Sequence, residues 1–249
     1  MIILKSDDEI KKIALASKIV AEILRLLEYM IKPGVTTKEI EQYVEKIIKE
    51  RNAVAAFKGY KGYPSSLCTS INEEVVHGIP SKKRILKDGD IISIDVGVLY
   101  RGFIGDAART YPVGKVSQET NRLLKVAEDS LYKGIEQALP SNRVSDISHA
   151  IQSHVERNGY SVVRNFVGHG VGKALHEEPQ VPNYGPPNQG PKLRRGMVLA
   201  IEPMVNAGTS DVVILKDRWT AVTNDGMSSA HFEHTVVVTD DKPRILTRL

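Results

Sequence analysis

The chain has one cysteine, few aromatic residues and no long apolar run, and each shortage excludes a class of protein. Cys68 is the single cysteine in 249 residues, so an internal disulfide framework is excluded and a reducing cytoplasm is expected. No apolar run approaches the roughly 18 residues that a membrane-spanning helix needs. The apolar start, Met1 to Leu4, is too short for a secretory signal. We therefore expect a cytoplasmic protein without a membrane partner.

Neither basic nor acidic residues are in large excess. Lys and Arg number 34 against 30 Asp and Glu, which gives a formal net charge of +4. The basic residues are scattered, apart from short clusters at residues 82–84 and 194–195 that are typical of solvated loops. Direct nucleic-acid recognition is therefore not expected. The length suffices for a substantial buried core.

Four helices are predicted where apolar residues recur at helical spacing. Two of them follow a Ser or Thr with a Glu three residues later, which is the pattern of a capping box: Ser6 with Glu9, and Thr36 with Glu39. Strands and loops are expected after each pair of helices. The predicted helices span about residues 7–31, 119–139 and 146–157, with one more between Thr36 and Asn52.

This arrangement recurs after 107 residues. Pro33 and Pro140 follow the first helix of each half, and LKDGDIISID (86–95) aligns with LRRGMVLAIE (193–202), since 202 − 95 = 107. A shared offset across helix ends and strands indicates an internal duplication. We expect an α+β fold of two halves related by a pseudo-two-fold axis, with a central antiparallel sheet and outer helices. The expected single domain spans residues 1–249, with halves of about 1–115 and 116–249.

The segment IISIDVGVLYRGFIGDAART (91–110) carries two aspartates into a predicted buried hairpin. If the chain turns around Tyr100-Arg101, Asp95 and Asp106 lie directly opposite each other, with Cβ atoms about 4.5–5.5 Å apart. At an effective dielectric near 20, two such charges repel by about 3 kcal/mol. A structural interpretation needs a shared proton or an Arg partner such as Arg101 or Arg109. A metal site or an acid/base pair is the interpretation we favour.

The second half supplies further candidates for the same site. Glu202 ends an apolar strand as the counterpart of Asp95, and Glu233 begins another strand. His169 lies between glycines that let the backbone approach closely, although a lone histidine more often packs or faces solvent. If the four carboxylates and His169 converge, two divalent ions balance the four negative charges. The ligand types suit Mn, Fe, Co or Zn.

Five segments in order resemble the signature segments of type I methionine aminopeptidases in peptidase family M24. They are NEEVVHGIP (72–80), residues 93–110, GHGVGKALHEEP (168–179), IEPM (201–204) and FEHTVVVT (232–239). The resemblance covers about residues 5–245 and implies the pita-bread fold. The short N-terminus resembles the short bacterial form, and the lack of a large insertion between His169 and Glu202 resembles type I and not type II.

The resemblance implies hydrolytic removal of the initiator methionine from nascent chains whose second residue is small, by a water that two divalent metal ions activate. It implies that Asp95 binds one ion, that Asp106 and Glu233 bridge both, and that His169 and Glu202 complete the other. Glu202 would also be the general base. The implied substrate contacts near the scissile bond are His77 and His176.

The resemblance also implies an apolar methionine pocket, since aromatic faces and a thiol suit a thioether. Leu175 stands where Phe is frequent, and Phe57 where a smaller residue occurs, so side-chain selectivity is open; Trp219 could instead pack as core. A monomer is expected, with the ribosome as a partner for an enzyme of emerging chains. The implied pocket residues are Tyr63, Cys68, Leu175 and Trp219, with Phe57 and Tyr60 nearby.

Three alternatives remain from the sequence. An Xaa-Pro aminopeptidase shares the metal ligands but usually adds an N-terminal domain. A non-catalytic scaffold of this fold would have lost ligands, and all five are present here. A two-metal phosphoesterase fits the carboxylates but has no use for an apolar pocket.

Overall fold

All four predicted helices form, and capping explains where the first two begin. The computed structural model describes residues 1–249. The side chains of Ser6 and Thr36 accept hydrogen bonds from the amides of Glu9 and Glu39, whose carboxylates accept from the cap amides in return. Such boxes satisfy amides that the first helical turn leaves unpaired. The helices are α1 (Asp7–Met30), α2 (Thr37–Glu50), α3 (Gln118–Glu136) and α4 (Val144–Arg157).

The helix ends differ slightly from the prediction. The third helix was expected to reach Leu139, but it ends at Glu136, and residues 137–140 continue as turns and bends ahead of α4. Both helices of the second half begin one or two residues earlier than expected. The apolar periodicity locates a helix well, whereas its last turn depends on contacts that the pattern does not record.

The strands form four antiparallel sheets. Strand β4 pairs with β1, β2 and β5, and the five-stranded sheet has the order β15-β14-β9-β7-β8. The first sheet contains β1 (Val54–Ala55), β2 (Cys68–Ile71), β4 (Ile91–Tyr100) and β5 (Phe103–Pro112). The five-stranded sheet contains β7 (Gly168–Gly170), β8 (Glu177–Val181), β9 (Val198–Ile201), β14 (His234–Val237) and β15 (Arg244–Ile245). The two small sheets contain β6 (Ser161–Val162), β10 (Met204–Asn206) and β13 (Ser229–His231), and β3 (Glu74–Val76), β11 (Val212–Ile214) and β12 (Ala221–Thr223).

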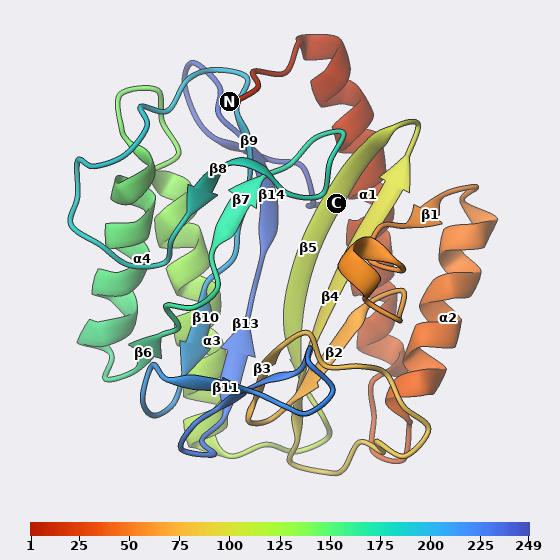
Figure 1. The fold of residues 1–249 in the computed structure, drawn as a ribbon. Coiled ribbons are helices and arrows are strands. Elements are labelled where there is room, and N and C mark those ends of the chain that lie inside the picture. The colour runs from red at the N-terminus through yellow and green to blue at the C-terminus, as the bar shows by residue number, and fades with distance from the viewer.

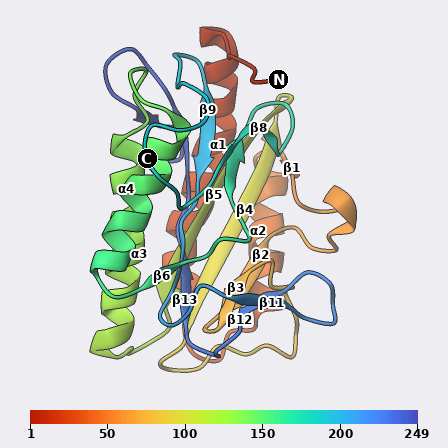
Figure 2. The same cartoon turned by 60° about the vertical axis from the view of Figure 1, so that its left-hand side comes forward.

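Each helix pair covers its own part of the strand layer. Figure 1 shows α1 and α2 on one side of the molecule and α3 and α4 on the other, with the long hairpin β4–β5 and the strands β9, β13 and β14 between them. Figure 2 shows α3 and α4 on the far side of the strands from β11 and β12. Two apolar cores of similar size, with 24 and 20 buried residues, lie under the two pairs. No helix is both long and apolar enough to cross a bilayer.

The two halves of the strand layer meet along a seam between β5 and the segment that joins β13 to β14. The amide of Glu233 donates to the carbonyl of Ala108 at 2.9 Å. On one side of that bond, the hydroxyl of Thr235 bonds both backbone groups of Asp106. On the other side, the hydroxyl of Thr110 bonds the backbone of His231 in the same way. The seam therefore places acidic residues of the two halves side by side.

Candidate metal centre and active site

The five predicted metal ligands come from five places in the strand layer. Asp95 lies in β4 and Asp106 in β5, while Glu202 directly follows β9. Glu233 lies between β13 and β14, and His169 is the middle residue of β7. All five line one cavity.

The predicted direct opposition of the two aspartates was wrong. Asp95 pairs with Ala108 in the ladder, so Asp106 is its diagonal neighbour on the same face. The turn residues are Arg101 and Gly102, one position later than predicted, with φ angles of 50° and 78°. Two positive φ values are what a type I′ hairpin turn requires. The slip changes the spacing of the carboxylates but not the face they share.

The ligand atoms lie close enough together to bind cations. One ligand atom from each of Asp106, His169 and Glu233 lies within 4.8 Å of the other two. His169 Nε2 lies 3.4 Å from Glu202 Oε1 and 3.9 Å from Asp106 Oδ2. Asp95 is joined to this group by the cavity it lines and by its electrostatic effect on Asp106.

Unpartnered carboxylate oxygens show that the cluster fits divalent cations. Asp95 Oδ1, Asp106 Oδ1 and Glu233 Oε1 are buried and have no hydrogen-bond partner. A buried polar atom without a partner is costly, and a buried carboxylate is normally paired or bound to a metal. Hard carboxylate oxygens with one imidazole form a donor set suited to divalent ions. A cation between them would satisfy all three oxygens.

The ring of His169 is oriented as a ligand. Its Nδ1 lies 2.9 Å from the carbonyl of Gly170, which can only accept, so Nδ1 carries the proton and Nε2 presents a lone pair to the carboxylates. Burial, with a smaller effect of His176, lowers the pKa of His169 to about 3. The imidazole is therefore neutral near pH 7, as metal binding requires.

The buried carboxyl groups hold protons more tightly than exposed ones. Burial raises the pKa of Asp95 to about 7, with Glu202 adding to the effect and His231 opposing it. Burial raises the pKa of Glu202 to about 8. Burial and the neighbouring carboxylates raise the pKa values of Asp106 and Glu233 well above their ordinary range. Bound cations reverse this effect, because they favour the ionised form.

The residues predicted for the methionine pocket line the same cavity, whose volume is about 250 Å³. The rings of Tyr63 and Trp219 meet edge to face with centroids 5.1 Å apart. Trp219 packs partly against a buried apolar cluster and also lines the cavity, so the two interpretations of it hold together. Burial raises the pKa of the Cys68 thiol, which is therefore neutral. The pocket residues are Phe57, Tyr60, Tyr63, Cys68, Leu175 and Trp219.

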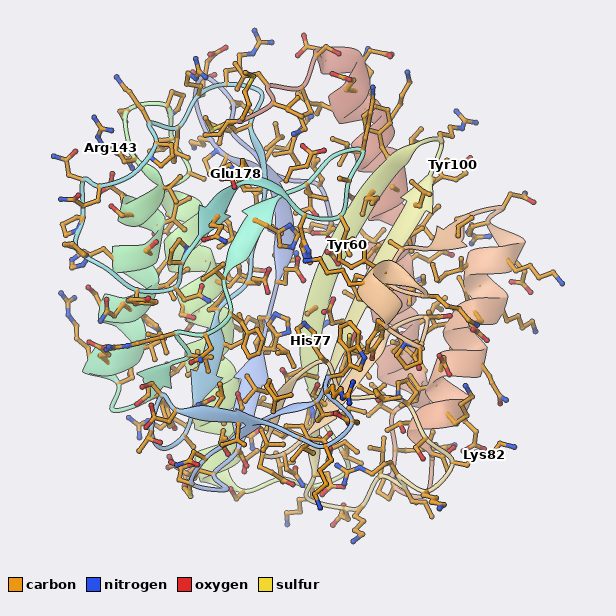
Figure 3. All side chains as sticks on the ribbon, viewed as in Figure 1. Tyr60, His77, Lys82, Tyr100, Arg143 and Glu178 are labelled. Atoms are coloured by element: carbon orange, nitrogen blue, oxygen red, sulfur yellow. The ribbon has the colours of Figure 1, made fainter.

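The two predicted substrate-contacting histidines also reach this cavity. His77 has a φ angle of 62°, an uncommon conformation for a residue with a side chain, and its ring lies edge to face on Trp219. Burial lowers its pKa to about 4. His176 Nδ1 lies 2.9 Å from the hydroxyl of Tyr60. Figure 3 shows Tyr60 and His77 near the middle of the strand face, far from the labelled Lys82 and Arg143 at its edges.

His231 belongs to the site, although the sequence did not single it out. Its Nε2 is buried without a hydrogen-bond partner and lies 3.7 Å from Glu202 Oε2. It also lines a second cavity of about 430 Å³, which shares six lining residues with the first, among them His77, Asp95 and Glu202. Its place in AHFEH was the available signal, because residues two apart on an extended chain point the same way.

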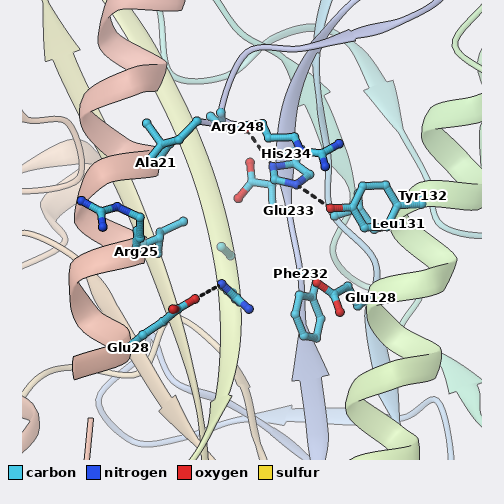
Figure 4. Close-up of a pocket in the computed structure, with 15 residues that line it drawn as sticks. Ala21, Arg25, Glu28, Glu128, Leu131, Tyr132, Phe232, Glu233, His234 and Arg248 are labelled. Atoms are coloured by element: carbon cyan, nitrogen blue, oxygen red, sulfur yellow. Dashed lines mark hydrogen bonds and ion pairs between the residues drawn. The ribbon is translucent and has the colours of Figure 1, made fainter. Parts of the chain in front are cut away.

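Another cavity lies on the helix side of the strands, between α1 and α3, with a volume of about 320 Å³. Glu28 forms an ion pair with Arg109 in its wall. Figure 4 shows Glu28 with this pair as a dashed line, and His234 beside Tyr132. It shares only Glu233 with the pocket that holds the ligands, and no metal-type cluster forms there. The candidate site is therefore singled out by the grouping of its carboxylates with His169, and not by the size of its cavity.

Comparison with known proteins shows which family the chain belongs to. The sequence model of metallopeptidase family M24 matches residues 11–240. Methionine aminopeptidase of Clostridium acetobutylicum is 56% identical over 247 residues, 99% of each chain. Methionine aminopeptidase 1 of Bacillus subtilis is 55% identical over the whole of both chains. The crystal structure of methionine aminopeptidase from Thermotoga maritima is 49% identical and superposes with a TM-score of 0.98 over 100% of both chains.

The resemblance seen in the sequence is thus confirmed, and with it the pita-bread fold. The chain belongs to metallopeptidase family M24 and, within it, to the methionine aminopeptidases.

Proposed function

We propose that the protein is a metal-dependent aminopeptidase that removes the initiator methionine from nascent chains whose second residue is small. One observation carries this proposal: a single cavity is lined both by the cluster of carboxylates with His169 and by an apolar, largely aromatic pocket. The first half of that lining suits hydrolysis of a peptide bond, and the second suits a thioether side chain.

Two divalent ions are proposed, because four carboxylates then meet four positive charges. Asp106 and Glu233 would bridge them, Asp95 would bind one, and His169 and Glu202 would bind the other. When bound, such a pair supplies Lewis acidity and lowers the pKa of its water toward about 7. The ligand types suit Mn, Fe, Co or Zn.

We assign the proton transfers to Glu202. Its carboxylate takes a proton from the attacking water as the water oxygen bonds to the first carbonyl carbon, and it delivers that proton to the leaving nitrogen as the carbon–nitrogen bond breaks. Its second oxygen, Oε2, lies 3.7 Å from His231, outside hydrogen-bond range.

His176 and His77 are proposed to bind the substrate near the scissile bond. If the hydroxyl of Tyr60 donates to His176 Nδ1, the proton of the neutral ring lies on Nε2, where it can donate to the carbonyl oxygen as negative charge develops there. His77 is neutral near pH 7 because burial lowers its pKa to about 4, so it also acts as a hydrogen-bonding group and not as a cation.

The setting of the enzyme follows from its proposed substrate. Nascent chains with an N-terminal methionine emerge from the ribosome, so we propose that the protein works in the cytoplasm, close to the ribosome, as a monomer and a single domain. Size-exclusion chromatography with light scattering tests the monomer, and co-sedimentation with ribosomes tests the association.

The test of the proposed activity is peptide cleavage after chelation and Mn²⁺ back-titration. Metal-dependent release of methionine from Met-Ala-Ser, with Leu-Ala-Ser and Ala-Pro-Ser left intact, is the expected result. It would also show that Leu175 and Phe57 still form a methionine pocket. Cleavage of Ala-Pro-Ser alone would contradict the proposal and favour the proline-specific branch. Failure with every divalent metal would contradict it as well.

A further inference from the structure

We propose that Lys5 is a positioning residue for the active site, acting through Glu177 on the loop that presents Leu175 and His176. The inference rests on the proposed function, because it assigns the loop a role in methionine release. Lys5 precedes α1 and lies 172 residues from Glu177 in the sequence. No motif connects the two positions.

The ion pair between Lys5 and Glu177 is buried. Lys5 Nζ donates to Glu177 Oε2 at 2.5 Å and to the carbonyl of Ile3 at 3.0 Å. The side chains are 4% and 9% exposed, so neither charge is compensated by solvent. Removing one partner of such a pair leaves a buried charge that must move or lose its ionisation.

The same carboxylate shapes the active-site loop. Glu177 Oε1, the oxygen that Lys5 does not contact, accepts hydrogen bonds from the amides of Lys173 at 3.0 Å and Ala174 at 3.2 Å. The loop is thereby folded back onto its own end. Leu175 and His176 follow Ala174 directly, and both line the substrate cavity.

Gly172 lies directly against this pair. A Cβ atom at that position would lie 2.6 Å from Glu177 Oε1 and 2.7 Å from Lys5 Cε, both closer than real contacts allow. The backbone of Lys5 is fixed as well, since its amide donates to the carbonyl of Gly196 at 2.8 Å. The N-terminal segment therefore forms the support beneath the loop.

Loss of the support should change two properties together. Leu175 is 5% exposed in the pocket wall, so a shift of the loop alters how the pocket fits a side chain. His176 holds its contact with Tyr60 only if the loop keeps its place. A displacement of about 1 Å in an active site is enough to lower a rate on the order of 10²-fold.

The experiment compares Lys5→Met with Lys173→Met. Lys173 lies in the same loop, but its ion pair with Glu9 is 3.8 Å long and its side chain is 72% exposed, so it is a matched control. The measurements are kcat and KM for Met-Ala-Ser and Leu-Ala-Ser, Mn²⁺ affinity by calorimetry, and hydrogen exchange of residues 171–178.

In Lys5→Met, we expect kcat on Met-Ala-Ser to fall roughly tenfold or more, the preference over Leu-Ala-Ser to shrink, and the Lys173 and Ala174 amides to exchange faster. Mn²⁺ affinity should stay within about twofold of wild type, because Lys5 touches no ligand. Lys5→Arg should restore part of the rate, and Lys173→Met should resemble wild type. If Lys5→Met does not fold, Glu177→Gln serves instead, with the same expected changes.

Wild-type kinetics and exchange in a folded Lys5→Met or Glu177→Gln would overturn the inference, as would an equal loss in Lys173→Met. Failure of the wild-type protein to release methionine would contradict the proposed function instead. In that case the exchange of the Lys173 and Ala174 amides still decides whether Lys5 positions the loop.

Discussion

The hydroxyl of Thr235 forms two hydrogen bonds with the backbone of Asp106. Its Oγ1 donates to the carbonyl of Asp106 at 2.7 Å and accepts from the amide of the same residue at 3.2 Å. Thr235 lies two residues after Glu233, so these hydrogen bonds place the two proposed bridging residues, Asp106 and Glu233, next to each other. Thr110 holds the backbone of His231 in the same manner, at 2.8 and 2.9 Å. The hydrogen bonds along the seam between the two halves therefore also form the frame that positions residues of the proposed metal site.

Thr235→Val tests this frame, because it keeps the shape of the side chain and removes the hydroxyl. The two backbone groups of Asp106 lose their partner, so we expect a stability loss of about 1–3 kcal/mol and weaker Mn²⁺ binding. Chemical denaturation and calorimetry measure the two effects. Thr235→Ser retains the hydroxyl and should stay near wild type. Unchanged Mn²⁺ affinity in Thr235→Val would contradict the role of the seam.

Asp106→Asn separates the effect of the carboxylate cluster on stability from its effect on activity. The substitution removes an ionisable group whose pKa is held well above its ordinary range by burial and by the neighbouring carboxylates, so we expect the chelated variant to be at least as stable as the chelated wild type. Methionine release should be abolished, because a bridging ligand is lost. Thermal melts in chelator, together with peptide cleavage in Mn²⁺, check both parts. A folded variant with normal turnover would rule out Asp106 as a bridging ligand.

The stability of the metal-free protein should depend on pH with a defined sign. The pKa values of Asp95 and Glu202 are about 7 and 8 in the folded chain, against ordinary values of 3.8 and 4.5. Burial lowers the pKa values of His77 and His169, which gives the opposite slope below about pH 6.5, where these histidines still bind protons in the unfolded chain. Between pH 7 and 8 the carboxyls dominate, so the folded state binds more protons and the free energy of unfolding falls as pH rises. The slope is about 1.4 kcal/mol per pH unit for each such proton.

Saturating Mn²⁺ should reverse this trend, because bound ions displace the protons and binding strengthens with pH. Denaturant titrations at pH 7, 7.5 and 8, in chelator and in Mn²⁺, make the comparison. A stability in chelator that stays level or rises between pH 7 and 8 would show that the carboxyls are not perturbed as described.

His176→Ala should lower kcat with a smaller effect on KM, since its proposed hydrogen bond strengthens as charge develops on the carbonyl oxygen. Removal of one such donor costs roughly 10²- to 10³-fold in rate. Tyr60→Phe removes only the group that orients the ring and should cost less. His149→Ala, an exposed histidine on α4, is the control. An unaffected rate in His176→Ala would remove its assigned role.

Much of this architecture follows from local patterns. Capping boxes and apolar periodicity located the helices, and the motif segments singled out five proposed ligands that the fold then brings to one cavity. The turn of the hairpin was placed one residue too early, which moved the expected partner of Asp95 by two residues, from Ala108 to Asp106. Gly102 was the available signal, because a type I′ turn needs positive φ angles, which glycine adopts readily. The sequence predicts which side chains within one motif lie close together, because neighbouring positions in the chain are also near in space.

The parts that could not be predicted depend on contacts between distant segments. The hydrogen bonds between Thr235 and Asp106 join residues 129 apart, and the pair of Lys5 and Glu177 joins residues 172 apart. A threonine in a strand and a lysine near the N-terminus have ordinary surface or packing roles in most sequences. Only the fold shows that these two are buried against functional residues.

The four carboxylates and His169 are proposed to form a two-metal centre that cleaves the peptide bond. The most direct test is equilibrium dialysis of chelated protein against Mn²⁺, with bound ions counted and Met-Ala-Ser cleavage measured in the same samples. We predict no cleavage without bound metal and two bound ions per chain at saturation. In Asp106→Asn we predict that the chain no longer binds two ions and no longer cleaves the peptide. Full cleavage with no bound metal, or two ions still bound in Asp106→Asn, would contradict the two-metal centre.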